Sequence, residues 1–457
     1  MTARRQTGQT GRHALPHGKE VPPAGPAPRT GYPAANWLQA HRSGFFHRFS
    51  PFFSNYMFKA MNSSILVINC GSSSLKFALI DSASHEAVMT GLAEKLGLAD
   101  ACITFKHNGD KQTALLSAPD HAAAMHAIIE KLQQVSLLDS VKAIGHRVVH
   151  GGEHFKQSAL LDETAINEIE RCIKLAPLHN PAHILGIRTA IKEFPSLPQV
   201  AVFDTSFHQT MPEKAYLYAV PMKLYRENSL RRYGMHGTSY RFVAEEAAKM
   251  LGKPANETSL VIAHLGNGAS ISAIRNGKCA DTSMGLTPLE GLVMGTRSGD
   301  IDPSVFGYLA TERGMDIQSI TNMLNKESGL LGLSELSNDC RELEEAAAKG
   351  HEGAKRALEV FAYRLAKYVA SMSVGAGRLD AVVFTGGIGE NSSFLRAEVI
   401  NQLGFLGLKL DAAANEACIR GNAGRITAAD SVPALVINTN EELMIAMDTA
   451  KLAGLAN

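Results

Sequence analysis

The sequence predicts an α/β protein built as two similar lobes, each a mixed β-sheet flanked by helices. From Ser64 onward, short β-branched runs alternate with helical patterns, which is typical of an α/β architecture. The stretches "SILVINCGSSSLKFALID" (64–81) and "SLVIAHLGNGASISAIRNGK" (259–278) share one order: apolar strand, small-residue turn, second strand. Because 457 residues exceed one ordinary core, we expect duplicated lobes with a cleft between them.

Each predicted element rests on a local signal. The helices carry a capping residue or an i, i+3, i+4 apolar stripe. They follow Asp120, Asp162, Asn180 (with Pro181 at the first helical position) and Asn440, and they span 239–251 and 355–373. A Gly-rich turn, "VVFTGGIGENSSF", follows a strand and is predicted to start a further helix. Strands are predicted at the short apolar runs 65–68, 77–80, 143–149, 200–203, 260–264, 270–274, 381–385 and 434–437.

The first sixty residues differ in composition from the rest. They contain seven prolines, the only tryptophan (Trp37), eight Lys or Arg and one acidic residue (Glu20), without sustained periodicity. Such a segment cannot bury enough apolar surface to offset its ordering entropy, so residues 1–61 are predicted to be a disordered extension. "MNSSILVIN" reads like a natural start at Met61, which favours a misassigned start or a dispensable tail. An Arg-rich transit peptide is the alternative.

The charge and cysteine patterns exclude several classes of protein. Beyond residue 60 the chain has 37 basic and 43 acidic side chains, which argues against a general nucleic-acid surface. The six cysteines are scattered, without a C-x-x-C pair or a His cluster at metal-ligand spacing, and are read as reduced thiols. No apolar run approaches the ~18 residues of a membrane span. The sequence therefore predicts a cytoplasmic protein that binds neither nucleic acid nor membrane.

The Gly-rich turns are candidate phosphate cradles. No G-x-x-x-x-G-K-[ST] occurs, which excludes a Walker-type P-loop, and "GGIGEN" lacks the spacing of a dinucleotide fingerprint. Consecutive backbone N–H groups in a hairpin turn can still surround an anion. One such turn is more often only a turn, but two matched hairpins and a third Gly-rich turn favour a cleft that handles phosphate.

Further polar clusters supply the other parts of a phosphoryl-transfer site. "AIGHRVVHGGE" places Arg147 where a buried strand reaches a Gly-Gly turn, and "MGTRSGDIDP" places Arg297 in a Gly-rich loop. The planar fork of arginine matches carboxylate and phosphate oxygens. Asp204 ends a strand, His236 precedes a helix, and Glu441 lies in the first turn of another. Each of these residues alone has an ordinary interpretation, such as an ion pair, a core histidine or a helix-terminal charge.

Together these segments resemble the acetate kinase family from about Ser64 to the C-terminus. Nine motifs occur in that family's order: "VINCGSSSLKF", "GHRVVHGGE", "APLHNP", "VFDTSFHQTMP", "YGMHGTSY", "HLGNGAS", "MGTRSGDIDP", "FTGGIGEN" and "NTNEELMIA". The family belongs to the superfamily of actin, sugar kinases and heat-shock ATPases. The resemblance thus implies a duplicated ribonuclease H-like, actin-like ATPase fold with a nucleotide cleft between the lobes. It implies lobes of 62–205 plus 441–457 (acetate and phosphate) and 206–440 (nucleotide).

The resemblance also implies a reversible, Mg²⁺-dependent transfer of the ATP γ-phosphoryl group to acetate, giving acetyl phosphate and ADP by direct in-line transfer. Mn²⁺ is a possible substitute for Mg²⁺, and a homodimer is the implied assembly. The chemistry agrees, because acetate is already ionised at neutral pH and needs no general base. Positive charge and positioning must therefore dominate catalysis.

Site residues carry over where this sequence matches the family's motifs. The implied catalytic residues are Arg147, Asp204, His236 and Arg297, supported by Asn69 and His179. Arg147 would also bind substrate, together with Val149, Leu178, Met235 and Pro288. Asn69 and Glu441 would hold the metal, with Asp204 helping to order it. The implied ATP-binding residues are Ser72, Ser74, Lys76, His264, Leu265, Gly266, Asn267, Gly268, Asp339, Cys340, Arg341, Gly387, Ile388, Gly389, Glu390 and Asn391.

The chain departs from the family pattern near the expected site. Met235 and Cys340 stand where the family has or often has Phe, and Tyr240 stands where it usually has a second His. A flexible thioether is expected to loosen the acetate pocket, and Cys340 to admit other purine triphosphates. Val149 predicts acetate over propionate, because propionate-preferring relatives tend to have a smaller residue there. One methylene is worth only ~1 to 3 kcal/mol, so some propionate activity is expected.

Two rival functions remain open. One is a propionate or butyrate kinase of the same family. The other is an actin-like ATPase or chaperone, in which nucleotide hydrolysis drives a change of shape. Arg147 and Arg297 discriminate between the classes, because a chaperone has no need for a carboxylate pocket.

Overall fold

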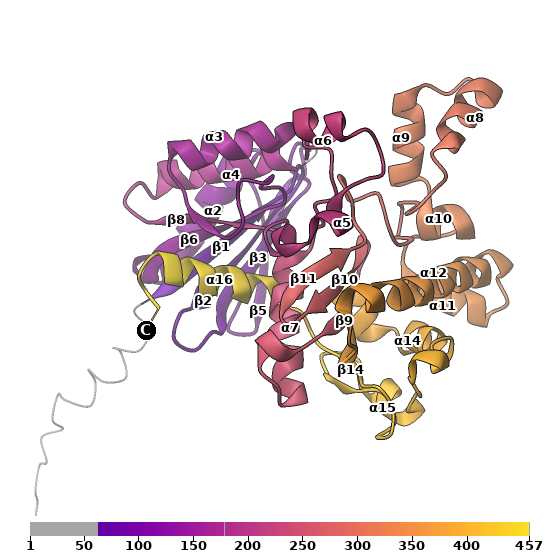
Figure 1. Cartoon of the computed structure of the whole chain (residues 1–457). Helices are drawn as coiled ribbons and strands as arrows, with labels where there is room; N and C mark the ends of the chain where they lie inside the picture. Colours follow the sequence, from indigo (N-terminus) through magenta and orange to yellow (C-terminus); the bar gives the residue numbers. More distant parts are fainter. Residues whose placement is uncertain (1–62, 178, 457) are drawn as a thin grey trace, which may run out of the picture. The chain divides into compact units, whose positions relative to one another are not determined.

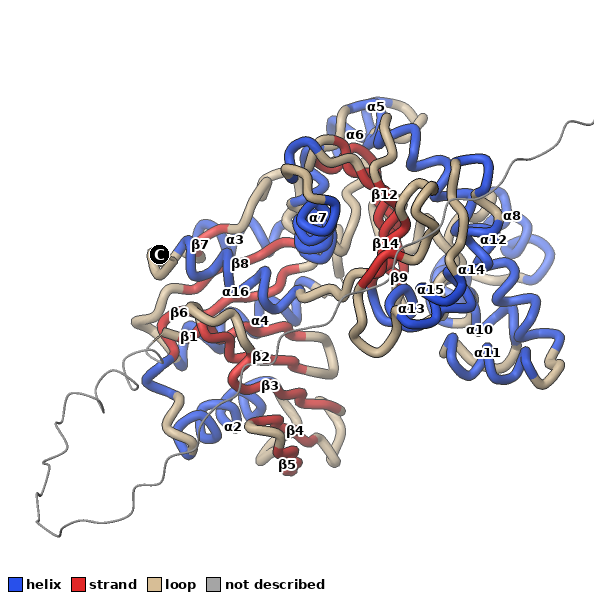
Figure 2. Tube along the Cα trace, turned by 90° about the horizontal axis from the view of Figure 1, so that it is seen from below, coloured by secondary structure: helices blue, strands red, loops and turns tan. Residues whose placement is uncertain are grey.

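The computed structural model describes residues 63–177 and 179–456. The predictions for residues 1–62, the disordered extension among them, and for Leu178 lie outside the described residues. Two mixed β-sheets run through the described chain, with helices packed on both faces of each (Figures 1 and 2). This is the fold class that the sequence predicts.

The first sheet has eight strands in the order β5-β4-β3-β2-β1-β6-β8-β7. β1 pairs antiparallel with β2 and parallel with β6, and β6 pairs parallel with β8. Every residue of β8 is buried, because helices cover both faces. The strands are β1 (Ser64–Cys70), β2 (Leu75–Asp81), β3 (Ala87–Glu94), β4 (Cys102–His107), β5 (Asp110–Leu115), β6 (Val141–Val148), β7 (Ala159–Leu160) and β8 (Gln199–Phe203).

The second sheet repeats the inner part of the first. Its order is β11-β10-β9-β12-β14-β13. In both sheets three antiparallel strands are followed by two parallel ones, so that β3-β2-β1-β6-β8 corresponds to β11-β10-β9-β12-β14. The predicted duplication of the hairpins is therefore confirmed. The strands are β9 (Leu260–Leu265), β10 (Ala269–Arg275), β11 (Lys278–Thr282), β12 (Ala381–Thr385), β13 (Gly424–Arg425) and β14 (Ala434–Val436).

Helices cover each sheet on two sides. α2 and α4 pack on one face of the first sheet and α16 on the other; α7 covers one face of the second sheet, and α12 with α14 covers the other. α16 is last in the chain, yet it lies on strands from the first sheet (Figure 1). The helices are α2 (His121–Gln134), α3 (Glu163–Arg171), α4 (Asn180–Glu193), α5 (Glu213–Tyr216), α6 (Met222–Asn228), α7 (Gly237–Leu251), α8 (Ser304–Arg313), α9 (Ile317–Lys326), α10 (Gly329–Ser334), α11 (Cys340–Ala348), α12 (Glu352–Ala376), α13 (Gly386–Asn391), α14 (Ser393–Asn401), α15 (Ala412–Ala417) and α16 (Glu441–Leu452).

The predicted helix starts are mostly confirmed. Asp120, Asp162 and Asn440 each accept a hydrogen bond from a backbone N–H of the first turn, as N-caps do. The predicted cap Asn180 is wrong by one residue, since α4 begins at Asn180 itself and His179 is the N-cap. The Asn180 amide instead donates to the carbonyls of His150 and Ile169, which ties α4 to the loop after β6.

The strands β3, β4 and β5 were not predicted. They form an antiparallel meander at the edge of the first sheet, and every residue of β5 is exposed. β3 and β4 alternate buried and less buried residues, and β5 is mostly polar, so none of the three forms a continuous buried run. The turn between β4 and β5, Asn108-Gly109, has φ of 51° and 85°, the positive values that a type I′ hairpin requires. This Asn-Gly pair was the sequence signal that could have predicted the hairpin. No helix among the described residues is long and apolar enough to cross a membrane.

Candidate active site

Arg147 and Asp204 form a buried ion pair at the ends of two neighbouring parallel strands. Arg147 lies near the end of β6, and Asp204 directly follows β8. The guanidinium donates to both carboxylate oxygens, with Nη2 to Oδ2 at 2.7 Å and Nε to Oδ1 at 3.2 Å. The Asp204 side chain is 2% exposed and that of Arg147 is 22% exposed. Arg147 thus remains partly accessible while it holds the carboxylate.

Electrostatics keep this pair charged. Burial acts to lower the pKa of Arg147, but Asp204 and the nearby Glu441 raise it by more, so the guanidinium stays protonated. Burial raises the pKa of Asp204, and Arg147 opposes that rise. With three donated hydrogen bonds from a cation, the carboxylate is ionised at neutral pH.

Arg297 differs from Arg147 in its surroundings. It is partly buried, and its Nη1 reaches only the Pro288 carbonyl at 3.4 Å and the Met294 sulfur at 3.7 Å. Burial lowers the pKa of Arg297, and no carboxylate among the described residues opposes this. Arginine nevertheless remains charged at neutral pH. A desolvated cation without a counter-charge is suited to receive an anion.

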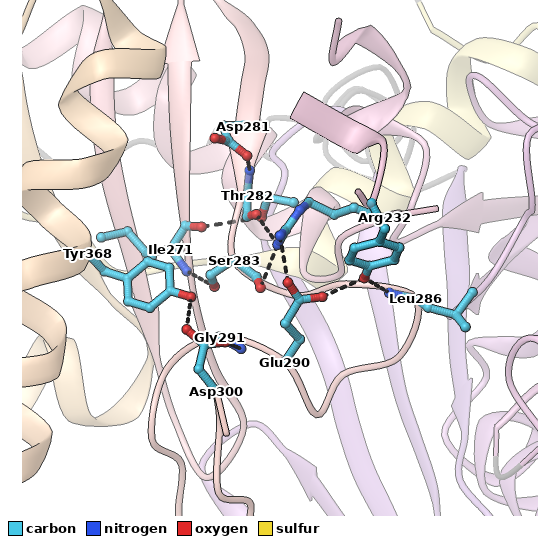
Figure 3. Close-up of polar contacts among 11 residues, drawn as sticks. Arg232, Ile271, Asp281, Thr282, Ser283, Leu286, Glu290, Gly291, Asp300 and Tyr368 are labelled. Carbon is cyan, nitrogen blue, oxygen red and sulfur yellow. Dashed lines mark hydrogen bonds and ion pairs between the residues drawn. The ribbon is translucent and has the colours of Figure 1, made fainter. Parts of the chain in front are cut away.

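A polar network holds the loop that carries Arg297 (Figure 3). Arg232 donates to the Glu290 carboxylate at 2.6 Å and to the carbonyls of Thr282 and Ser283. Asp300 accepts from the Gly291 N–H at 2.8 Å and from the Tyr368 hydroxyl at 2.5 Å. The loop is therefore fixed to the second sheet and to α12 on both sides of Arg297.

His236 is held in an uncommon backbone conformation. Its φ is +59°, in the left-handed region that few non-glycine residues adopt. The next residue, Gly237, donates its N–H to the Asp204 carbonyl at 2.9 Å, and a Cβ on Gly237 would lie 2.3 Å from that oxygen. Glycine is required at this close approach, which joins α7 to the end of β8. Such local strain is typical of functional sites.

The ring of His236 is oriented by hydroxyl groups. Its Nδ1 lies 2.8 Å from the Ser270 hydroxyl, which lies 2.5 Å from the Tyr240 hydroxyl. Burial lowers the pKa of His236, and the charges of His264, Arg147 and Arg297 lower it further, so the ring is neutral. If Ser270 donates to Nδ1, the proton of the neutral ring lies on Nε2. Nε2 is then the donor on the side where Gly268 and Arg297 lie.

We predict that Ser270→Ala lowers kcat by about tenfold with little change in KM for ATP, because Nδ1 loses the group that fixes the tautomer and orientation of the His236 ring. Steady-state kinetics check this. Ser272→Ala is the matched control, since Ser272 is a buried serine on the same strand whose hydroxyl donates to the Asp281 carbonyl. Equal kcat for the two variants would contradict the positioning role of Ser270.

Three further histidines lie close to Arg147. His146 is buried on β6, His179 is the N-cap of α4, and His183 follows one turn later. Burial, and to a smaller extent the charge of Arg147, lower the pKa of His183 to about 3. Neither ring nitrogen of His183 has a hydrogen-bond partner among the described residues. His183 is thus a buried, neutral imidazole near Arg147 whose ring nitrogens lack partners.

This makes His183 a source of acid instability. Its folded-state pKa lies below the unfolded value of 6.5, so only the unfolded chain takes up the proton as pH falls. The free energy of unfolding therefore decreases by up to ~1.4 kcal/mol per pH unit below about 6.5. We predict that His183→Leu moves the acid-unfolding midpoint to lower pH, measured by circular dichroism. The exposed His154→Leu is the control and should leave the midpoint unchanged.

A cavity of about 740 Å³, of a size that suits a nucleotide, lies beside the second sheet. Its walls come from the β9–β10 turn, the start of α11 and the helix α13. Eight of the predicted ATP-binding residues line it: Gly266, Asn267, Asp339, Cys340, Arg341, Gly387, Ile388 and Asn391. The Asn267 carbonyl accepts from the Gly295 N–H at 2.9 Å, so this cavity adjoins the loop of Arg297.

Other predicted ATP-binding residues lie elsewhere. Glu390 accepts from the backbone N–H groups of Gly386 and Thr439, so its carboxylate holds the loop and does not face the cavity freely. Ser72 is exposed and Lys76 pairs with Glu442, and neither lines the cavity. Ser74, His264, Leu265, Gly268 and Gly389 also lie outside its lining, although the last four belong to segments that border it.

The predicted acetate pocket is apolar where it is described. Val149 and Met235 are buried in one cluster with Met294 of the Arg297 loop. Pro288 is partly buried, and its carbonyl contacts Arg297. Pro288 and Met294 therefore join this apolar surface to Arg297, which is the combination that a short carboxylic acid requires.

The residues predicted to hold a metal offer oxygen ligands. Asn69 is the next-to-last residue of β1, and the preceding Ile68 pairs with His146 of β6. Glu441 opens α16 close enough to raise the pKa of Asp204. Among the described residues no three His, Cys, Asp or Glu side chains form a metal-binding group. Two carboxylates and an amide fit a cation such as Mg²⁺, which is commonly bound by one or two carboxylates together with substrate phosphates.

Several residues that build the site were not predicted. Asn338 and Glu344 line the nucleotide cavity, and both lie in the stretch "SNDCRELE" (337–344) that also contains the predicted ATP-binding residues Asp339, Cys340 and Arg341. Glu344 accepts from Cys340 and from Ser392, which fixes the cavity wall. Ser392, Ile419 and Arg420 also line the cavity. The last two follow α15, in a segment with no motif to mark them.

The chain has two sheets of matched strand order, and two arginines lie near a nucleotide-sized cavity. These features define a phosphotransferase of the actin-like ATPase type. The family model described as "Acetokinase family" matches residues 64–447. The chain belongs to the acetokinase family. Acetate kinase 1 of Neisseria meningitidis serogroup A is 64% identical over 393 residues, which cover 86% of this chain and 99% of that protein.

Further relatives agree. An acetate kinase of Shewanella baltica is 57% identical over 394 residues, covering 86% of this chain and 99% of that protein. The crystal structure of Porphyromonas gingivalis acetate kinase is similar with a TM-score of 0.82 and 42% identity, covering 85% of this chain and 99% of that one. A propionate kinase from Francisella tularensis has a TM-score of 0.82 and 48% identity, covering 85% and 100%.

Proposed function

We propose that this protein catalyses the reversible transfer of the ATP γ-phosphoryl group to acetate, giving acetyl phosphate and ADP. The observation that carries the assignment is Arg297, a desolvated guanidinium without a carboxylate partner beside the Arg147–Asp204 pair and next to the nucleotide cavity. Relatives named acetate kinase, 57% to 64% identical over 86% of the chain, support the same function.

In the proposed mechanism, the chain's residues supply charge and position. Acetate is nucleophilic as an anion, so the obstacle is the repulsion between two anions as they approach in line. Arg147 and Arg297 hold the carboxylate and the phosphoryl group, and neutral His236 donates from Nε2 to the phosphoryl oxygens. Asp204 is assigned no proton transfer, because it is engaged by Arg147 and serves to orient that guanidinium. Donors fixed before the reaction stabilise the developing charge without reorganisation.

A divalent cation, which we propose to be Mg²⁺ with Mn²⁺ as a substitute, fits the oxygen groups of Asn69, Asp204 and Glu441. When bound it neutralises charge on the nucleotide phosphates. Ser72, Ser74 and Lys76 are proposed to face the phosphate end of the nucleotide. Glu441 also stabilises α16, since a negative charge in the first turn of a helix is favourable.

We also propose the arrangement of the lobes and the assembly. Residues 62–205 with 441–457 form the acetate side and 206–440 the nucleotide side; the packing of α16 on β1, β6 and β8 supports this division. A cytoplasmic homodimer is proposed from the resemblance to the family. Size-exclusion chromatography with light scattering tests the assembly, and a monomer at micromolar concentration would contradict it.

A hydroxamate assay tests the function. Purified protein with ATP, Mg²⁺ and acetate is expected to form an acyl phosphate that hydroxylamine traps, and omission of acetate removes the signal. ATP hydrolysis that is independent of acetate would instead support an actin-like ATPase or chaperone. Binding of Mg-ATP without acyl phosphate from any short fatty acid would overturn the proposal.

A second candidate, a propionate kinase, is favoured by the similar Francisella structure. The buried Val149 argues for acetate, because its branched side chain occupies space that a longer acid needs. We predict that the wild type has a higher kcat/KM for acetate and that Val149→Ala shifts the ratio of kcat/KM values toward propionate by about tenfold, as one methylene is worth ~1 to 3 kcal/mol. Equal or better kcat/KM of the wild type with propionate would reassign the substrate.

A further inference from the structure

A second, smaller cavity lies behind the active site. Its volume is about 210 Å³, and it lies between the loop after β6, the segment after β8, the start of α7 and the β10–β11 turn. We call it the basic cavity, because its lining includes Lys156, Arg241 and Lys278 and no carboxylate of the described chain. It shares no lining residue with the nucleotide cavity.

The positive charge of the basic cavity is only partly neutralised. Arg241 donates to the Asp448 carboxylate at 2.6 Å, so that cation has a partner. Glu245 lines an adjoining cavity together with Arg241 and Lys278. Within the described part of the chain Lys156 and Lys278 form no ion pair, and both are exposed at the mouth. Two lysines therefore line the cavity without a paired carboxylate.

A buried hydroxyl without a partner in the wall of the cavity provides a second observation. Thr238 lines the cavity, is 3% exposed, and its Oγ1 has no hydrogen-bond partner among the described residues. The hydroxyls of Ser206 and Thr210 differ, because they donate to the carbonyls of Phe203 and Cys279. A buried polar group without a partner is costly, and the Thr238 hydroxyl has almost no accessible surface in this structure. A rotation of the Thr238 side chain into the cavity would let its hydroxyl donate to a ligand there.

We propose that the basic cavity binds a phosphate dianion, either inorganic phosphate or the phosphate group of a small metabolite. A volume of about 210 Å³ admits a phosphate or a short phosphomonoester but not a nucleotide. Lysine ammonium groups and a hydroxyl donor are common phosphate ligands. The proposal does not depend on acetate as the substrate of the main site.

The position of the basic cavity gives its ligand a structural effect. Lys156 comes from the loop after β6 of the first sheet, and Lys278 from the hairpin turn of the second. The wall between them includes Ser206 and Gly237, close to the hydrogen bond from the Gly237 N–H to the Asp204 carbonyl. A dianion that contacts both lysines therefore links the two sheets directly behind Asp204 and His236, and stabilises the folded chain.

Isothermal titration calorimetry of the full chain with inorganic phosphate tests this, with Mg-ADP and acetate present to fill the main site. The wild type is expected to bind one phosphate, and Lys156→Ala/Lys278→Ala to bind it at least about tenfold more weakly. Thr238→Val is expected to weaken binding severalfold. Lys111→Ala/Lys349→Ala is the matched control, since both lysines are exposed, form no ion pair in the described chain and line none of the cavities described above.

A second titration with glycerol 3-phosphate distinguishes free phosphate from the phosphate group of a small metabolite as the ligand. Tighter binding of the ester assigns the site to a phosphorylated metabolite, and equal binding assigns it to free phosphate. Equal phosphate affinity in the Lys156/Lys278 double variant and its control overturns the proposal, as does the lack of phosphate binding by the wild type. Failure of Mg-ADP to bind would count against the proposed function and not against the basic cavity, because the double variant and its control still differ in phosphate binding.

Discussion

Replacing Arg297 by alanine is expected to lower kcat for acetyl phosphate formation by about 10²-fold or more, the cost of one preorganised transition-state donor. Stability should remain close to that of the wild type, because Arg297 has no carboxylate partner that the substitution would leave unpaired. Its contacts are a long one to the Pro288 carbonyl and one to the Met294 sulfur. The hydroxamate assay and thermal unfolding measure the two effects.

Two further variants sharpen this test. Arg297→Lys retains the charge but loses the planar fork, so it should recover only part of the lost turnover. Arg226→Ala, at an exposed arginine on α6, is the control for loss of a positive charge and should behave as wild type. Turnover near the wild-type value in Arg297→Ala would remove Arg297 from the catalytic group.

Arg147→Ala is expected to lower turnover at least as much and, in contrast to Arg297→Ala, to destabilise the protein. Asp204 is 2% exposed, and without Arg147 it becomes a buried, unpaired carboxylate. Breaking a buried pair in this way costs about 3 to 5 kcal/mol. Thermal unfolding therefore distinguishes the two arginine variants even if their kinetics agree.

The double variant Arg147→Ala/Asp204→Asn separates folding from catalysis. Removing the unpaired charge of Asp204 should recover most of the stability but not the turnover.

The pH dependence of stability gives a second check on Arg147→Ala. Burial raises the pKa of Asp204 and Arg147 opposes that rise, so in Arg147→Ala the pKa of Asp204 should move further above its unfolded value and the folded state should bind the extra proton as pH falls. The difference in the free energy of unfolding between the variant and the wild type should then become smaller as the pH falls from neutral to mildly acidic. A difference that does not change with pH would contradict an unpaired Asp204.

The fold was predictable where one residue pattern specifies one structure. The buried runs of β1, β9 and β12 are continuous and apolar, and the helix starts at Asp120, Asp162 and Asn440 carry a capping side chain. The meander β3–β5 was missed because its residues alternate or are polar, and exposed edge strands need no apolar run. At Asn180 a capping residue type was present, but tertiary hydrogen bonds engaged its side chain instead.

The sequence predicted many of the residues of the candidate site but few of the contacts among them. Motifs identified both arginines, Asp204, His236 and most of the nucleotide cavity. No motif distinguished Arg147, which has a carboxylate partner, from Arg297, which has none among the described residues. Ser270 and Arg232, which contact His236 and the loop of Arg297, were also missed, since each contacts a residue distant in the sequence.

By itself the sequence determined the two matched hairpins, the cationic and Gly-rich motifs and the membership of a family, because these depend on residue type and local order. Tertiary structure decided which arginine is paired with a carboxylate, which histidine is neutral, and which lysines line the basic cavity. The physical reason is that burial and counter-charges set the state of an ionisable group, and both arise from segments far apart in the chain. α16 illustrates this, since the end of the chain returns to the first sheet and brings Glu441 near Asp204.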